Sequence, residues 1–107
     1  MSSPPPSGRG TLYVLQALSG GPYKIGWTSK PSAKARRADA QTYHPETLCL
    51  LRETPAYAAQ EKAVHKLLEA FRLSGEWFRD DPPVREFVDF LSAGSLDSYL
   101  TTPNDPA

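Results

Sequence analysis

Two short apolar runs interrupted by a glycine-rich break, residues 11–26, constrain this chain most strongly. Side chains in the first run, residues 12–15, alternate between two faces, which is the period of a β-strand. The break at 19–22, Ser-Gly-Gly-Pro, has the backbone freedom that a chain reversal needs. The second run, 23–27, is rich in aromatic and β-branched residues. The stretch predicts a β-hairpin, with Lys24 near the middle of its second strand.

A helix is predicted directly after the hairpin, at residues 31–41, because a proline and two serines suit its first turn. Ala33 and Ala40 are expected to pack on the sheet. Arg36 and Arg37 are adjacent, so their side chains leave a helix about 100° apart. At most one of these two arginines can therefore point into a shared site.

The second half of the chain predicts one more strand and two more helices. Residues 47–54 are apolar on both faces, so we expect this strand in the middle of the sheet. A Thr-Pro pair starts a helix over 54–73, and Gly75 would end it with a left-handed cap. A last helix follows residue 81, where apolar residues repeat at helical spacing. The prediction is an α+β fold, with a small three-stranded antiparallel sheet flanked by three helices.

Composition divides the chain into one folding domain, 11–93, and two tails. Residues 1–10 hold three consecutive prolines among serines and no apolar pattern, so we expect a disordered tail. Residues 94–107 are also unpatterned, and we expect a flexible C-terminal tail. No apolar run approaches the ~20 residues that span a bilayer, and the first residues lack a secretion signal. We therefore expect a cytoplasmic protein without a membrane segment.

Charge is distributed unevenly, although the formal net charge is zero. Residues 1–38 carry six basic and no acidic residues, whereas 39–107 carry six basic and twelve acidic residues. Such asymmetry can supply a local surface for phosphate, although a solvated helix face is the ordinary alternative. One cysteine and two histidines are too few for the usual structural zinc site.

Glu61 falls at the edge of the apolar arc of the helix predicted over 54–73, and His65 lies one turn further along. A carboxylate at the border of a buried face is well placed to bind a metal. A boundary glutamate that pairs with a nearby cation is the alternative. His65 has a structural alternative of the same kind. Trp77 and Phe78 are expected to pack in the core or at its rim rather than stack on bases.

Four features in this order resemble the GIY-YIG nuclease superfamily, in particular its small single-domain branch in phages and bacteria. They are the Tyr-Val and Lys-Ile-Gly motifs at 13–14 and 24–26, an arginine-bearing helix, a glutamate-bearing helix, and Gly-Glu-Trp-Phe at 75–78. Lys24 stands where the family name expects a second tyrosine, as it does in some restriction-enzyme relatives. The arginine comes two residues later than usual, so Arg36 and Arg37 both remain candidates.

The resemblance implies an endonuclease that hydrolyses phosphodiester bonds in DNA, with RNA as an open alternative. Tyr13 would be the general base, and Lys24 would lower its pKa. Arg36 would stabilise the phosphoryl transition state, because its planar fork matches two phosphate oxygens. Glu61 would hold Mg²⁺, which Mn²⁺ could replace. His65 would orient water or phosphate.

Lys30, Lys34 and Arg37 are expected to contact the nucleic acid. Because we find no recognition domain in the sequence, we expect a homodimer or a partner protein to supply specificity. Two alternatives remain open. The first is a catalytically inactive module that binds nucleic acid or protein on the same fold. The second is an interaction domain with no link to nucleic acid.

Overall fold

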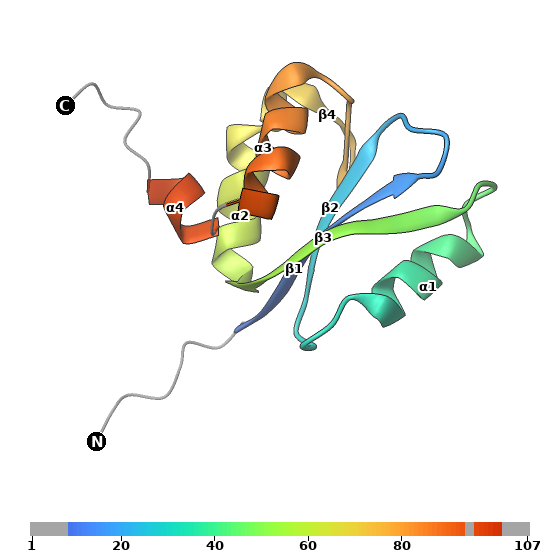
Figure 1. Cartoon of the computed structure of the whole chain (residues 1–107), viewed down its shortest axis with the longest axis horizontal. Coiled ribbons are helices and arrows are strands. Elements are labelled where there is room, and N and C mark those ends of the chain that lie inside the picture. The colour runs from blue at the N-terminus through green and yellow to red at the C-terminus, as the bar shows by residue number, and fades with distance from the viewer. Residues whose placement is uncertain (1–8, 94–95, 102–107) are drawn as a thin grey trace.

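An antiparallel sheet runs through the middle of the protein, with its strands in the order β3-β1-β2-β5-β4 (Figure 1). The structure, a computed structural model, describes residues 9–93 and 96–101. The strands are β1 (Arg9–Ala17), β2 (Tyr23–Thr28), β3 (Leu48–Tyr57), β4 (Arg72–Ser74) and β5 (Trp77–Phe78).

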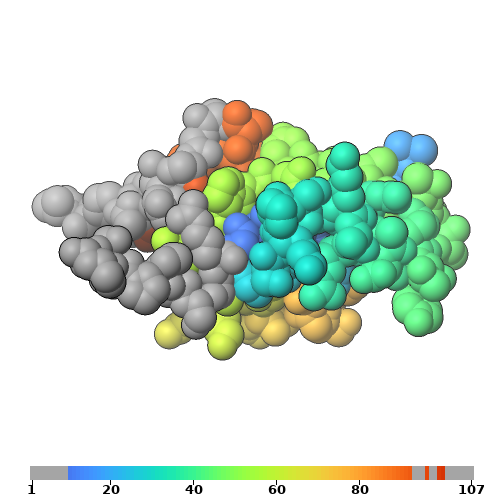
Figure 2. All heavy atoms as spheres, turned by 90° about the horizontal axis from the view of Figure 1, so that it is seen from below, coloured from blue at the N-terminus to red at the C-terminus, as the bar shows by residue number. Residues whose placement is uncertain are grey.

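Helices cover both faces of the sheet. They are α1 (Lys34–Thr42), α2 (Ala58–Leu67), the 3₁₀ helix η1 (Glu69–Phe71), α3 (Pro82–Ala93) and α4 (Leu96–Thr101). Helix α1 lies alone on one face, and α2, α3 and α4 lie on the other (Figure 1). Figure 2 shows the molecule from the α1 side, where the teal helix covers much of the visible surface. None of the described helices has the length and hydrophobicity that crossing a bilayer requires.

The alternation in β1 sorts its side chains between these two layers. Leu12 and Val14 are fully buried in the larger core beneath α2, α3 and α4. Tyr13 and Leu15 are buried in a smaller core beneath α1. β1 pairs with β2 as an antiparallel hairpin in which Tyr13 faces Gly26. The predicted hairpin, the α+β class and the two-faced first strand are therefore confirmed.

The predicted number of strands was wrong, because the described residues form five strands and not three. The two additional strands, β4 and β5, have three and two residues, too few to show a readable period. Gly75 does adopt a left-handed backbone, with φ of 56°, but it lies in the turn between these strands and ends no helix.

The predicted start of the second helix was also wrong. β3 continues through Pro55 to Tyr57, and α2 begins only at Ala58. β3 also stands at an end of the strand order rather than in its middle. An edge strand tolerates proline, because its outward N–H groups need no partner strand. The strand is apolar on both sides because Leu48 and Leu51 contact opposite cores.

Both predicted tails are shorter than expected. β1 begins at Arg9, and α4 occupies 96–101 within the segment expected to be flexible. Leu96 is only 1% exposed and belongs to the larger core, which explains why this turn of helix packs on the domain. The remaining tail residues, 1–8, 94–95 and 102–107, lie outside the described residues.

Candidate active site

A polar cleft of about 430 Å³ opens between α1 and the exposed face of the hairpin. Its walls combine two bases, two acids and four aromatic or apolar groups from segments far apart in the sequence. The lining residues are Tyr13, Lys24, Trp27, Arg36, Asp39, Ala40, Tyr43 and Glu76.

Gly26 makes room for the polar groups at the floor of this cleft. A Cβ at this position would lie 2.5 Å from Tyr13 Oη and 2.7 Å from Glu76 Oε1. Tyr13, which pairs with Gly26 across the hairpin, is 3% exposed. The missing side chain therefore lets a phenol oxygen and a carboxylate occupy the same small region above β2.

We expect Gly26→Ala to displace Tyr13 or Glu76 and to lower the free energy of unfolding by about 1–3 kcal/mol, as overpacking does. Gly21→Ala is the matched control. Gly21 has φ of 94° and open space around it, so alanine there adds backbone strain without touching the cleft. Denaturant unfolding measures stability, and the NMR resonances of the Tyr13 ring report its position. An unchanged Tyr13 resonance in Gly26→Ala would contradict this account of the cleft.

Lys24 pairs with Glu76, an acid to which the sequence analysis gave no role. Lys24 Nζ donates a hydrogen bond of 2.8 Å to Glu76 Oε1. The Ile25 N–H also donates to the Glu76 carbonyl, at 2.9 Å, so the backbone fixes this turn beside β2. Its only signal in the sequence was its place in the Gly-Glu-Trp-Phe motif at 75–78. Its contact with Lys24, 52 residues away, depends on the pairing of β2 with β5.

The structure contradicts the expected lowering of the Tyr13 pKa. Burial, followed by the charge of Glu76, raises the pKa of Tyr13 to about 12. Among the nearby charges, Arg36 opposes this shift, and Glu61 and Asp39 add to it. With this pKa, the Tyr13 phenol is protonated at neutral pH in the metal-free protein.

Glu61 reaches the same region from α2, which packs against β2. Its side chain is 16% exposed, and its buried Oε2 atom has no hydrogen-bond partner among the described residues. Burial raises the pKa of Glu61 to about 7, and the charge of Glu76 and a hydrogen bond with it add to the shift. Lys24 acts in the opposite direction. Glu61 is therefore close enough to influence the Tyr13 phenol electrostatically, although α2 covers the other face of the sheet.

This arrangement fits a hard divalent cation. Oxygen ligands from one or two carboxylates are what Mg²⁺ takes from proteins when waters and substrate complete its shell. Glu61 offers a buried oxygen without a partner, and Glu76 offers a second carboxylate beside it. The described residues contain no cluster of three or more His, Cys, Asp or Glu side chains suited to a metal. Any metal here would thus be held mainly by waters and substrate oxygens.

His65 is engaged by the backbone. Its Nε2 donates a hydrogen bond of 2.8 Å to the Ile25 carbonyl, and its ring packs on Phe78 at 5.0 Å between centroids. The same nitrogen lies 3.9 Å from Glu61 Oε2. This geometry favours the structural alternative, in which His65 ties α2 to β2 and so positions Glu61.

The two arginines of α1 point in different directions, as their adjacency predicts. Arg36 lines the cleft, whereas Arg37 Nη1 donates to the Leu48 carbonyl of β3 at 3.4 Å. The start of α1 is fixed because the N–H of buried Ala33 donates to Glu53 Oε1 at 2.9 Å.

Lys30 and Lys34 are exposed, and neither lines the cleft. Lys30 contributes only its backbone to the local structure, since its carbonyl accepts a hydrogen bond from Thr11 Oγ1. Lys30 precedes α1, and Lys34 is its first residue. Their contact with nucleic acid remains a prediction.

The fold and the cleft together define a class of small α+β domain. In this class a β-hairpin and helices on both faces of the sheet bring acidic and basic side chains close to one tyrosine. The chain belongs to the T5orf172 domain family, whose model matches residues 10–93. This is a phage-associated domain related to nuclease-type modules, and the match does not by itself assign the GIY-YIG superfamily. Comparisons with curated proteins and with solved structures found no match.

Proposed function

We propose that this protein is a Mg²⁺-dependent endonuclease that hydrolyses phosphodiester bonds in DNA, as GIY-YIG nucleases do. One observation carries the proposal. Glu61 presents a buried carboxylate oxygen without a partner in the same region as Tyr13 Oη and Glu76, next to a cleft that Arg36 lines. A nuclease-type role agrees with the T5orf172 family.

Arg36 is the residue that binds the scissile phosphate in this proposal. Its guanidinium can donate to two phosphate oxygens at once and so offset the charge that grows on them in the transition state. Its position on a helix anchored by Glu53 limits its motion. Arg37 cannot take this role while its guanidinium contacts the Leu48 carbonyl of β3.

Tyr13 is the base that takes a proton from the attacking water. Its hydroxyl must first lose its own proton, and the Glu76 carboxylate, which like Tyr13 Oη borders the open space above Gly26, would accept it. Lys24 holds Glu76 in this position and balances its charge. A divalent ion held by Glu61, with waters and substrate oxygens completing its shell, would stabilise the leaving oxygen and favour the phenolate form of Tyr13.

An inactive module that binds nucleic acid on the same fold is the second candidate. The observation in its favour is the pKa of Tyr13, which burial and then the charge of Glu76 raise to about 12 in the resting protein. The deciding experiment incubates the purified chain with duplex DNA, single-stranded DNA and RNA, in Mg²⁺, in Mn²⁺ and in EDTA. Metal-dependent cleavage of DNA supports the nuclease. Binding without cleavage under every condition would leave only the inactive module.

Arg36→Ala is expected to lower the cleavage rate by about 10²-fold, because one preorganised charged donor is lost from the transition state. Arg37→Ala is the matched neighbour, and we expect it to change the rate less than about 5-fold while lowering the melting temperature. Initial rates on one DNA substrate, together with thermal unfolding, separate the two effects. A larger rate loss in Arg37→Ala than in Arg36→Ala would reverse the assignment.

A further inference from the structure

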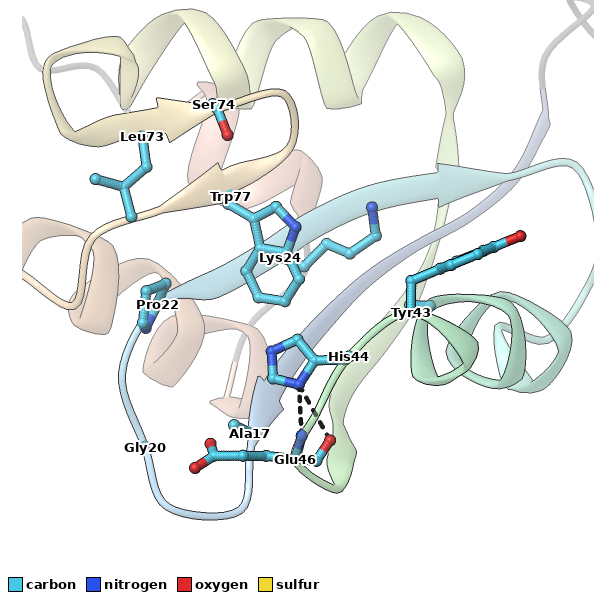
Figure 3. A pocket seen from close by; sticks show the side chains of 11 residues that line it. Ala17, Gly20, Pro22, Lys24, Tyr43, His44, Glu46, Leu73, Ser74 and Trp77 are labelled. Atoms are coloured by element: carbon cyan, nitrogen blue, oxygen red, sulfur yellow. Dashed lines mark hydrogen bonds between the residues drawn. The ribbon is translucent and has the colours of Figure 1, made fainter.

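A second hollow, of about 480 Å³, adjoins the proposed active site. It shares Lys24, Ala40 and Tyr43 with the first cleft, so the two spaces are continuous along the sheet. Figure 3 shows this pocket, with the Lys24 side chain running beside the Trp77 ring toward the shared side. A group bound in the pocket and a ligand in the cleft would therefore contact the same three side chains.

Flat and apolar groups form much of the wall of this pocket. The rings of His44 and Trp77 are stacked, with centroids 5.6 Å apart and planes inclined by 24°. The Lys24 ammonium lies 5.9 Å from the Trp77 ring centroid. Pro22 and Leu73 stand on the side away from Tyr43 (Figure 3), and Leu73 is 51% exposed. Phe78 is fully buried as expected, whereas Trp77 is only half-buried and faces this space.

A polar group stands at the rim of the same pocket. Glu46 is exposed, and its Oε1 accepts a hydrogen bond of 2.8 Å from Ser19 Oγ. The Glu46 N–H donates to His44 Nδ1 at 3.1 Å, which orients the imidazole against Trp77 (Figure 3). A carboxylate at this place can accept a hydrogen bond from an amino group on the edge of a planar heterocycle. The pocket thus offers aromatic rings, apolar walls and an acceptor at its rim.

We propose that this pocket binds one unstacked nucleobase of the strand whose phosphate occupies the cleft. The inference rests on the proposed function and adds the preferred substrate, which is single-stranded or locally unpaired DNA. A base is joined to its phosphate through one sugar, so a base can enter the pocket while a phosphate reaches Arg36 through the shared opening. Bases in a duplex are stacked and paired, and they must be extruded before they can fill such a pocket. Stacking on an aromatic ring tolerates any base sequence.

The test compares three fluorescent ligands in EDTA at one salt concentration, because phosphate contacts depend on salt. The ligands are a 12-nucleotide single strand, a fully abasic strand of equal length and a 12-base-pair duplex. We expect the wild-type chain to bind the single strand about 10-fold or more tightly than the abasic strand. Trp77→Leu should remove this difference, and Trp77→Phe should keep most of it. Phe90→Leu, on α3 across the sheet, serves as the control for loss of an aromatic ring.

The outcomes separate this inference from the function on which it rests. Equal binding of single and abasic strands by the wild-type chain overturns the base pocket, even if the protein cleaves duplex DNA. An equal loss for all three ligands in Trp77→Leu, with thermal unfolding unchanged, also overturns it. If the wild-type chain binds none of the three ligands and cleaves nothing, the proposed nuclease function is overturned, and the base pocket is overturned with it. Arg36→Ala should weaken all three ligands alike, because it removes a phosphate contact.

Discussion

Tyr13→Phe is expected to lower the rate of DNA cleavage by about 10²- to 10⁴-fold, the range that general acid–base catalysis supplies. The substitution removes only the hydroxyl, and the ring keeps its place in the core beneath α1. Thermal unfolding should therefore change little while single-turnover cleavage is nearly lost. Tyr99→Phe, on α4 at the opposite face, is the matched control and should retain the wild-type rate.

The pH dependence of cleavage provides a second measurement on the same residue. Because the pKa of Tyr13 is raised to about 12, its phenolate fraction increases tenfold for each pH unit below that value. The wild-type rate should rise with pH between about 7 and 9, and Tyr13→Phe should lose this rise. A bound divalent ion lowers the phenol pKa, so the rise should level off at a lower pH as metal concentration increases. A Tyr13→Phe rate within about 3-fold of wild type would remove Tyr13 from the mechanism.

Glu61→Gln is expected to abolish metal-dependent cleavage, with a loss of about 10³-fold or more, and yet to stabilise the metal-free protein at neutral and higher pH. The amide keeps the size of the side chain and one acceptor oxygen, and replaces the other oxygen with an NH2 donor. It removes the negative charge that a divalent ion needs. The same charge is unfavourable in the metal-free protein, because it is buried beside Glu76. Activity and stability should thus move in opposite directions, as they do where a charged site is held at a cost to the fold.

The sign of the stability effect follows from proton linkage. The folded state raises the pKa of Glu61 from 4.5 to about 7, so it binds more protons than the unfolded state between these values. The contribution of this group to stability is favourable below pH 4.5 and is lost as pH rises through 7. Relative to wild type, Glu61→Gln should gain on the order of 1–3 kcal/mol above pH 7 and little at pH 4.

Denaturant unfolding at pH 4.5 and pH 8, with and without Mn²⁺, measures both parts of this prediction. Mn²⁺ should raise the unfolding midpoint of the wild-type chain and leave Glu61→Gln unchanged, because ligand binding stabilises only the state that binds. Glu69→Gln, on η1, is a control acid whose side chain is 64% exposed. Destabilisation of Glu61→Gln at pH 8 would contradict the electrostatic account of this residue.

Local sequence patterns predicted the parts of the fold that depend on near neighbours. The alternation around Tyr13 and the glycine-rich break predicted the hairpin, and the spacing of apolar residues predicted α3. Errors occurred where a longer-range contact overrides a local signal. The Thr-Pro pair resembles a helix start, but pairing with β1 keeps residues 54–57 extended. Leu96 anchors α4 through the core, although its surroundings in the sequence show no pattern.

The candidate site also has parts that were predictable from the sequence and parts that depend on long-range contacts. The resemblance to a nuclease superfamily suggested Tyr13, Arg36 and Glu61 as site residues. The proposed choice between the two adjacent arginines depended on the position of β3 beneath α1.

By itself, the sequence determined an α+β domain with a tyrosine on an inner strand face and an acid at a helix border, because period and residue type are properties of short segments. Only the tertiary structure decided that Glu76 joins Lys24 across 52 residues and crowds Glu61 and Tyr13. The physical reason is that electrostatic shifts depend on burial and on distances between charges. Those distances arise from strand pairing between remote segments, which no local pattern encodes.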